Sequence, residues 1–251
     1  KSGTPPAVQT AGVTFRVTVN LCDRFYNPVP NPEDYEWDPP VNPQDKSPQT
    51  AVRSSDRYDI EPDTKALVTG FQVYDMTLLT GATFHVLTAA DADPFRPDYL
   101  QDSSRKFTVR HSSAAFLQIL LDGETLVQGS LSGKTGTPAA KFAGDDNLLA
   151  YVYLTDAYYN VVADTAMPTV NVQTWDPKDV QPNNLTLSGG WNTFILKPRQ
   201  ASSSWTATTF DVSGNSNYTS RTSSELRVWP AEVHHMHLSY RNPATDVEIS
   251  S

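Results

Sequence analysis

A His-His-Met-His run at positions 234–237 is one place where side-chain types and spacing suggest metal chemistry. On a β-strand, alternate side chains point to opposite faces, so His235 and His237 would share a face. Two imidazoles can bind one metal ion, but a protein site normally needs three or four ligands. The run therefore favours an amphipathic strand over a metal site, with apolar contacts from Val233, Met236 and Leu238.

Two Asp/Asn pairs are weak candidates for Ca²⁺ binding. Asp23 and Asn27 form one pair, and Asp156 and Asn160 form the other at the same spacing. Calcium prefers oxygen ligands of this kind, but the spacing does not match an EF-hand loop. Asp and Asn side chains also stabilise turns through their own backbone, and we favour that interpretation for both pairs. We accordingly expect no cofactor.

No catalytic motif is found along the chain. The sequence lacks a nucleophile elbow, a zinc-protease helix motif, a phosphate-binding loop and a dinucleotide fingerprint. Carboxylates are scattered through segments rich in turn residues, where no spacing selects an acid–base pair. We therefore predict that the protein is not an enzyme.

A proline-rich, acidic insert at residues 28–48 holds seven of the 19 prolines. Such a segment is unsuited to a helix or a central strand, so it predicts a long surface loop. Tyr35 and Trp37 are its candidate binding contacts, because long ordered loops often carry function. The sequons at Asn184 and Asn217 are possible glycosylation sites.

The chain also repeats itself, which indicates a duplicated structural unit. The segment 23–27 recurs at 156–160, an offset of 133, and residues beyond the insert recur at an offset of 120. Phe71 and Phe84 align with Trp191 and Trp205, which predicts duplicated core positions for these aromatic residues.

Short β-rich runs separated by turn residues predict an all-β protein. The clearest run alternates apolar and polar residues from Val13 to Val19. The repeat and the number of runs favour two tandem immunoglobulin-like β-sandwiches, at residues 1–111 and 112–230, followed by a tail at 231–251. At 251 residues, each unit is long enough to bury its own core.

Charge and hydropathy exclude two classes of partner. The net charge is −9 and no basic stripe is present, so nucleic acid is not an expected partner. No window of about 18 apolar residues occurs, so we expect no membrane insertion. Cys22 is the single cysteine, which rules out an internal disulfide.

The segment 120–138, with Gly133-Lys134-Thr135-Gly136-Thr137-Pro138, and the following Asp156-Ala157-Tyr158-Tyr159-Asn160 resemble the start of tandem bacterial immunoglobulin-like repeats. Such repeats occur in large secreted and cell-surface proteins. The resemblance implies an extracellular, cell-surface location and a structural or adhesive role. The insert at 28–48 departs from the repeat pattern.

The first repeat copy is expected to lack its first strand. An apolar run, Phe116–Leu121, precedes the Gly-Thr-Pro of the second copy, but only Lys1 and Ser2 precede that of the first. A similar run lies in the tail at 231–251, which is expected to be either a donor strand or the start of a third repeat. A sheet edge without its strand invites a strand from another chain, as in donor-strand complementation. The expected donor contacts are Val233, His235, Met236, Leu238 and Tyr240.

We therefore expect a structural subunit of an extracellular filament or surface sheath, assembled head to tail by strand donation from the tail. Its partners would be copies of itself or adjacent immunoglobulin-like repeats. One alternative is a ligand-binding adhesin fragment of a longer repeat array, which would contact host or neighbour-cell proteins. A second alternative is a module that binds surface glycans.

Overall fold

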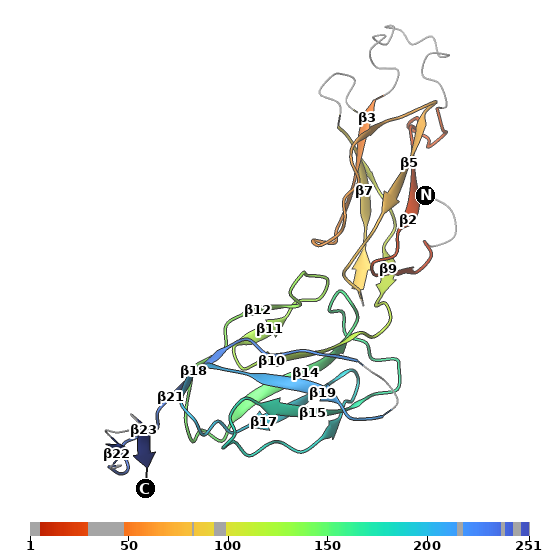
Figure 1. Cartoon of the computed structure of the whole chain (residues 1–251). Coiled ribbons are helices and arrows are strands. Elements are labelled where there is room, and N and C mark those ends of the chain that lie inside the picture. Colours follow the sequence, from red (N-terminus) through yellow and green to blue (C-terminus); the bar gives the residue numbers. More distant parts are fainter. Residues whose placement is uncertain are drawn as a thin grey trace.

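The computed structural model describes residues 6–29, 48–81, 83–92, 99–214, 218–236, 239–242 and 247–250. Strands and turns make up these residues, and no helix is found among them, so the all-β prediction is confirmed. None of the described segments forms a helix that could span a membrane. Two β-sandwich units lie end to end (Figure 1), here called domain 1 (strands β1–β9) and domain 2 (strands β10–β21).

Domain 1 is built on one four-stranded sheet and two smaller ones. The orders are β4-β3-β7-β8, β1-β9-β6 and β2-β5. The strand bounds are β1 (Gln9–Thr10), β2 (Phe15–Asn20), β3 (Gln49–Ser54), β4 (Lys65–Ala66), β5 (Phe71–Met76), β6 (Thr83–His85), β7 (Leu87–Asp91), β8 (Asp102–Ser103) and β9 (Phe107–Arg110).

Domain 2 has the sheets β17-β14-β10-β20, β13-β21-β18 and β16-β15-β19, with a β11-β12 hairpin. Its strands are β10 (Phe116–Leu121), β11 (Glu124–Leu126), β12 (Lys134–Gly136), β13 (Lys141–Phe142), β14 (Leu148–Thr155), β15 (Thr169–Thr174), β16 (Leu185–Thr186), β17 (Trp191–Leu196), β18 (Ser202–Trp205), β19 (Ala207–Asp211), β20 (Thr219–Ser220) and β21 (Leu226–Trp229). In the tail, β22 (Ser239–Asn242) pairs with β23 (Val247–Ser250) as a hairpin apart from the sandwich (Figure 1).

The two domains repeat the same strand register. In domain 1, β2 runs antiparallel to β5 with Phe15 opposite Met76. In domain 2, β14 runs antiparallel to β17 with Leu148 opposite Leu196. These partners are 133 and 120 residues apart between the domains, which are the two offsets of the sequence repeat. The shared register lets residues of one domain be assigned counterparts in the other.

Three expectations about individual apolar residues are wrong. Phe84 is 68% exposed, whereas Trp205 is fully buried; the counterpart of Trp205 is His85, which is buried in domain 1. Phe71 and Trp191 do correspond, but each is 46% exposed because both begin a strand with the side chain outward. Val13 is exposed and precedes β2, since the chain turns at 11–12 before the strand begins.

The junction between the domains is a specific polar contact. Asn160, fully buried in the loop after β14, donates from Nδ2 to the carbonyl of Leu79 at 2.8 Å. Its Oδ1 accepts the N–H of Gly81 at 2.7 Å. The N–H of Ser112, in the linker, donates to Oδ2 of Asp156 at 2.8 Å. The side-chain amide of Asn160 thus bonds a carbonyl and an N–H of the same turn in domain 1, and these bonds fix how the two domains meet.

Gly12 completes this junction. It has φ of +76°, and a Cβ placed on it would lie 2.1 Å from Cε2 of Tyr158. The Tyr158 ring therefore lies directly on the Gly12 backbone and packs against the core of domain 1. Both the backbone conformation and the close approach require glycine at this position.

Asp56 holds the domain 1 side of the junction in shape. Its Oδ2 accepts the N–H groups of Leu79 and Thr80 at 2.7 and 2.8 Å, and its Oδ1 accepts the Thr80 hydroxyl at 2.6 Å. Burial disfavours the charged carboxylate, but the hydrogen bonds outweigh burial and hold the pKa of Asp56 below its ordinary value. Asp176 is its counterpart in domain 2 and also has a lowered pKa.

Candidate functional site

The main candidate site is an open edge on β2 of domain 1. In domain 2, the counterpart strand β14 pairs with β17 on one side and with β10 on the other. Among the described residues, β2 pairs with β5 alone. The described residues before Gly12 (6–11) do not close this edge, because β1 pairs with β9 in a different sheet. The described part of domain 1 therefore has no strand at the place that β10 fills in domain 2.

Side-chain burial shows what the absence of such a strand exposes. In domain 2, the β14 residues Leu148, Ala150, Val152 and Leu154 are all fully buried. Their counterparts in domain 1 are each only half-buried, and they are Phe15, Val17, Val19 and Leu21. A half-buried apolar row along a strand edge favours binding of another apolar segment.

Two cavities of about 580 and 250 Å³ lie along this edge. Both are lined by Val19, Asn20, Cys22, Ala89 and Asp102, so they form one continuous groove between β2 and β8. The smaller cavity reaches Val52 and Leu87 in the core. At the far end, Leu100 lines the larger cavity and is 98% exposed. We call this feature the β2 groove.

The β2 groove corresponds to the position of β10 in domain 2. There, Leu117, Ile119 and Leu121 point into the core with no exposed surface. β10 runs antiparallel to β14 and parallel to β20, which spans Thr219–Ser220. The groove therefore has the geometry to take one extended segment with apolar residues at alternate positions.

Cys22 lines the groove and is exposed. Partial burial and the neighbouring carboxylates of Asp23 and Asp102 raise the pKa of its thiol. Its counterpart Thr155 is fully buried opposite Phe116 of β10. The thiol therefore lies where an incoming strand would cover it.

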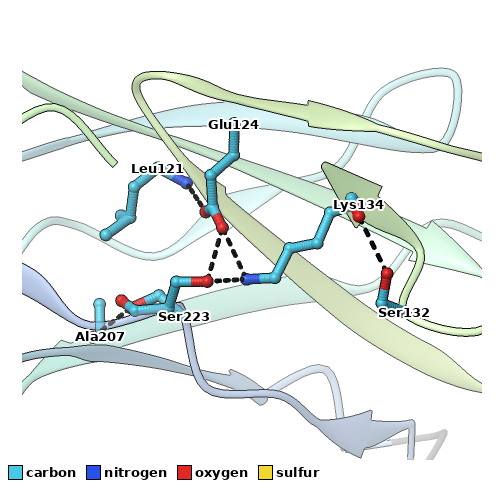
Figure 2. A network of polar contacts seen from close by, with 7 residues as sticks. Leu121, Glu124, Ser132, Lys134, Ala207 and Ser223 are labelled. Carbon is cyan, nitrogen blue, oxygen red and sulfur yellow. Dashed lines mark hydrogen bonds and ion pairs between the residues drawn. The ribbon is translucent and has the colours of Figure 1, made fainter. Parts of the chain in front are cut away.

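In domain 2, β10 fills the position that corresponds to the β2 groove, and a buried ion pair holds this strand in place (Figure 2). Glu124, whose side chain is 1% exposed, lies 2.9 Å from Nζ of Lys134. Its second oxygen accepts the N–H of Leu121 at the end of β10, at 2.8 Å. Nζ of Lys134 and Oε1 of Glu124 both bond the hydroxyl of Ser224, at 2.7 and 2.6 Å. This network joins β10 and the β11-β12 hairpin to the body of domain 2.

We expect Glu124→Ala to destabilise domain 2 by about 3 kcal/mol, because it leaves the largely buried Lys134 ammonium without its carboxylate. The measurement is chemical denaturation followed by tryptophan fluorescence, since Trp205 is buried in this domain. Ser132→Ala is the control: its hydroxyl contacts the Lys134 carbonyl at an exposed position, so a change within about 0.5 kcal/mol is expected. Equal effects of the two variants would contradict the assigned role of Glu124.

The structure brings the Asp/Asn pairs into hydrogen-bonded turns. Both oxygens of Asp156 accept N–H groups, including the Asn160 side chain at 2.9 Å, and Asp23 and Asn27 repeat the arrangement. This supports the turn interpretation, and the expected absence of a cofactor stays a prediction. Among the described residues, no three His, Cys, Asp or Glu side chains gather as a metal site.

The other sequence candidates are dispersed. His235 lies edge-on to His234 at 5.8 Å and is exposed, as are Val233 and Met236. Asn184 is exposed just before β16. Five other candidates lie outside the described residues: Tyr35, Trp37, Asn217, His237 and Leu238. For Tyr240 the backbone of β22 alone is described.

Sequence reasoning named Asp156 and Asn160 as turn or calcium candidates but not as a contact between domains, and it missed Gly12, Asp56 and most of the groove lining. The recurrence of Asp56 as Asp176 was a usable signal, because each carboxylate accepts two backbone N–H groups at corresponding positions of its own domain. No family model matches this chain, and no curated protein matches it either.

Proposed function

We propose that the protein is a structural subunit of an extracellular filament or surface sheath, in which a tail strand of one copy fills the β2 groove of the next. The observation that carries the proposal is the groove itself, beside a strand whose counterpart in domain 2 is fully covered by β10. The resemblance to bacterial surface repeats supports the extracellular setting.

The spacing of the tail supports the donor role. In domain 1, β9 ends at Arg110, and β10 begins six residues later at Phe116. β21 ends at Trp229, so the same spacing begins a donor strand at His235. With this spacing, Met236, Leu238 and Tyr240 of the tail correspond to the core-facing residues Leu117, Ile119 and Leu121 of β10. All three tail residues are apolar or aromatic. In this register Val233 belongs to the linker, the counterpart of Ala114.

The open edge explains why a strand is favoured over a small ligand. Within the described part of the chain, backbone N–H and C=O groups on the outer edge of β2 lie unpaired beside an apolar groove. Each such group costs about 1 to 3 kcal/mol when it is buried without a partner. A β-strand satisfies the backbone and fills the groove together, whereas a compact ligand leaves part of the edge unpaired.

The test uses the Cys22 thiol as a reporter of groove occupancy. Electron microscopy of the full chain should show filaments, and Cys22 should react with a maleimide in dilute subunits but not in filaments. Leu238→Asp should abolish filaments and keep Cys22 reactive. Glu232→Gln is the control, because Glu232 corresponds to the exposed Ser113 of the linker. It should change neither filament formation nor the protection of Cys22 in filaments. Filaments of the Leu238→Asp chain, or a reactive Cys22 within filaments, would refute strand donation.

A further inference from the structure

Both halves of the internal junction occur a second time, at the outer ends of the molecule. One half is the loop Asp156–Asn160, and the other is the end of domain 1 around Gly12 and Leu79–Gly81. The counterpart of the loop is Asp23–Asn27 in domain 1, here called the apical loop. The counterpart of the other half lies in domain 2 at Ala143–Gly144 and Arg199–Ala201, here called the socket.

The apical loop is already folded as its docked counterpart is. The N–H groups of Phe25 and Asn27 donate to Asp23 Oδ1 at 2.8 and 2.9 Å, and Asn27 Nδ2 donates to Asp23 Oδ2 at 2.9 Å. The same three bonds in domain 2 measure 2.8, 2.9 and 2.9 Å. The left-handed residue also recurs, with φ of 65° at Tyr26 and 61° at Tyr159. Docking would therefore need no refolding of this loop.

The groups that make the internal contact are exposed in the apical loop, where the neighbouring Arg24 guanidinium lies 4.5 Å from the centre of the Phe25 ring. Phe25, the counterpart of Tyr158, is 68% exposed. Asn27 is exposed, and within the described parts of the chain its Oδ1 has no hydrogen-bond donor, whereas Oδ1 of Asn160 accepts the Gly81 N–H. The apical loop thus presents an aromatic ring and an amide in the arrangement that the internal junction uses.

The socket has the same backbone hydrogen bonds as its counterpart in domain 1, which the Asp156–Asn160 loop fills. Gly144 donates to the Pro198 carbonyl at 2.8 Å, as Gly12 donates to Leu78 at 2.8 Å. The N–H groups of Arg199 and Gln200 bind Asp176, as those of Leu79 and Thr80 bind Asp56.

The socket differs from its counterpart in being open. A Cβ on Gly144 would lie 3.9 Å from Arg199 Nη1, its nearest neighbour, compared with 2.1 Å from the Tyr158 ring at Gly12. Gly144 also has a positive φ, of +101°. The space that an aromatic ring fills over Gly12 is therefore available over Gly144.

We propose that the apical loop of one copy docks in the socket of a second copy and reproduces the internal junction between subunits. Asn27 would donate to the Arg199 carbonyl and accept the Ala201 N–H, with Phe25 lying on Gly144. The Arg199 guanidinium would lie beside that ring, which favours a cation–π contact. The inference rests on the proposed head-to-tail assembly, for which it defines the contact that orients successive subunits.

A second copy is the favoured occupant because the tail leaves domain 2 as the linker leaves domain 1. Ser112, which bonds Asp156 in the internal junction, corresponds to Ala231, and Ala231 retains a backbone N–H that could bind Asp23 of the next copy. One approach of the subunits would then seat the apical loop and direct the tail toward the β2 groove.

Disulfide trapping tests this contact in the full chain. Two proteins are prepared on a Cys22→Ser background, one with Asn27→Cys and one with Ala201→Cys, and mixed under mild oxidation. The hydrogen-bonded geometry of Asn160 and Gly81 predicts Cα atoms close enough for a disulfide, so a covalent heterodimer should form. Adding Gly144→Ala to the second protein should slow trapping by about 10-fold or more, because the methyl group meets the Phe25 ring.

Leu131→Cys is the matched control for position 201. Leu131 is 98% exposed on the β11-β12 hairpin, near Gly129, which approaches Thr80 at the opposite end of domain 2. It should give no heterodimer with Asn27→Cys. Equal trapping at positions 131 and 201, or none at 201, overturns the docking contact. Filaments with a protected Cys22 but no trapping at 201 would refute docking alone. Trapping with no filaments would refute strand donation alone.

Discussion

In the Leu238→Asp chain, whose β2 groove should stay empty, a peptide of residues 232–251 with the native sequence should raise the melting temperature of domain 1 by more than about 10 °C. Three side chains entering the β2 groove would each contribute about 1.5 to 3 kcal/mol of apolar burial before the cost of association. A gain of 1 kcal/mol shifts the melting temperature of a domain of this size by about 4 to 8 °C. Domain 2 should not respond, because β10 already fills its corresponding position.

Hydrogen exchange measured by mass spectrometry resolves the two domains in this experiment. Amides of β2 and the turn after it should become protected when the peptide is added, since its backbone would pair with Val17–Cys22. A peptide with Leu238→Asp is the control and should give no protection. Protection that spreads equally over β14 would indicate nonspecific binding and contradict the groove assignment.

Asp56→Asn should destabilise domain 1 by about 3 kcal/mol at neutral pH, since a carboxylate accepting several hydrogen bonds in a buried turn is replaced by an amide. The lowered pKa of Asp56 sets the pH dependence. Its stabilisation is fully present above the unfolded pKa of about 3.9 and is lost as pH falls through the folded pKa. The difference between wild type and variant should therefore shrink in acid.

The pH dependence must be measured as the difference in stability between wild type and the Asp56→Asn variant. Burial raises the pKa of Asp59 in the same domain, so the titration of Asp59 changes the stability of both proteins in the opposite direction to that of Asp56. Asp176→Asn is the matched change in domain 2. Asp56→Asn should also release the junction, since Asn160 binds the turn that Asp56 supports, whereas Asp176→Asn should leave the junction intact. A wild-type to variant difference that is independent of pH would contradict the role of the Asp56 charge.

The sequence predicted the strands and the repeat because alternating apolar residues and turn residues act locally. The β14 strand and the loop Asp156–Asn160 follow directly from such patterns. The aromatic alignment failed because it matched Phe84 to Trp205 at an offset of 121, whereas the repeat offset in this segment is 120, and on a strand one residue reverses the face. His85, and not Phe84, is therefore the buried counterpart of Trp205.

The groove and the junction needed three-dimensional information. That a strand is uncovered depends on pairing between distant segments, such as β2 with β5 and β7 with β8. The role of Asn160 depends on a turn 81 residues away in sequence, which no local pattern reveals. The repeated Asp and Asn residues indicated turns, but not that one turn is a buried contact and the other is exposed.

The covalent attachment of β10 to its own sandwich has a consequence for assembly. Domain 2 carries a strand of its own, held by Glu124 and Lys134, so under the proposed assembly each subunit would offer one open groove and one donor strand. Growth would then be linear and unbranched, with chemically distinct ends. A polymer of this kind would elongate at different rates at its two tips, and a subunit with a blocked tail would cap one of them alone.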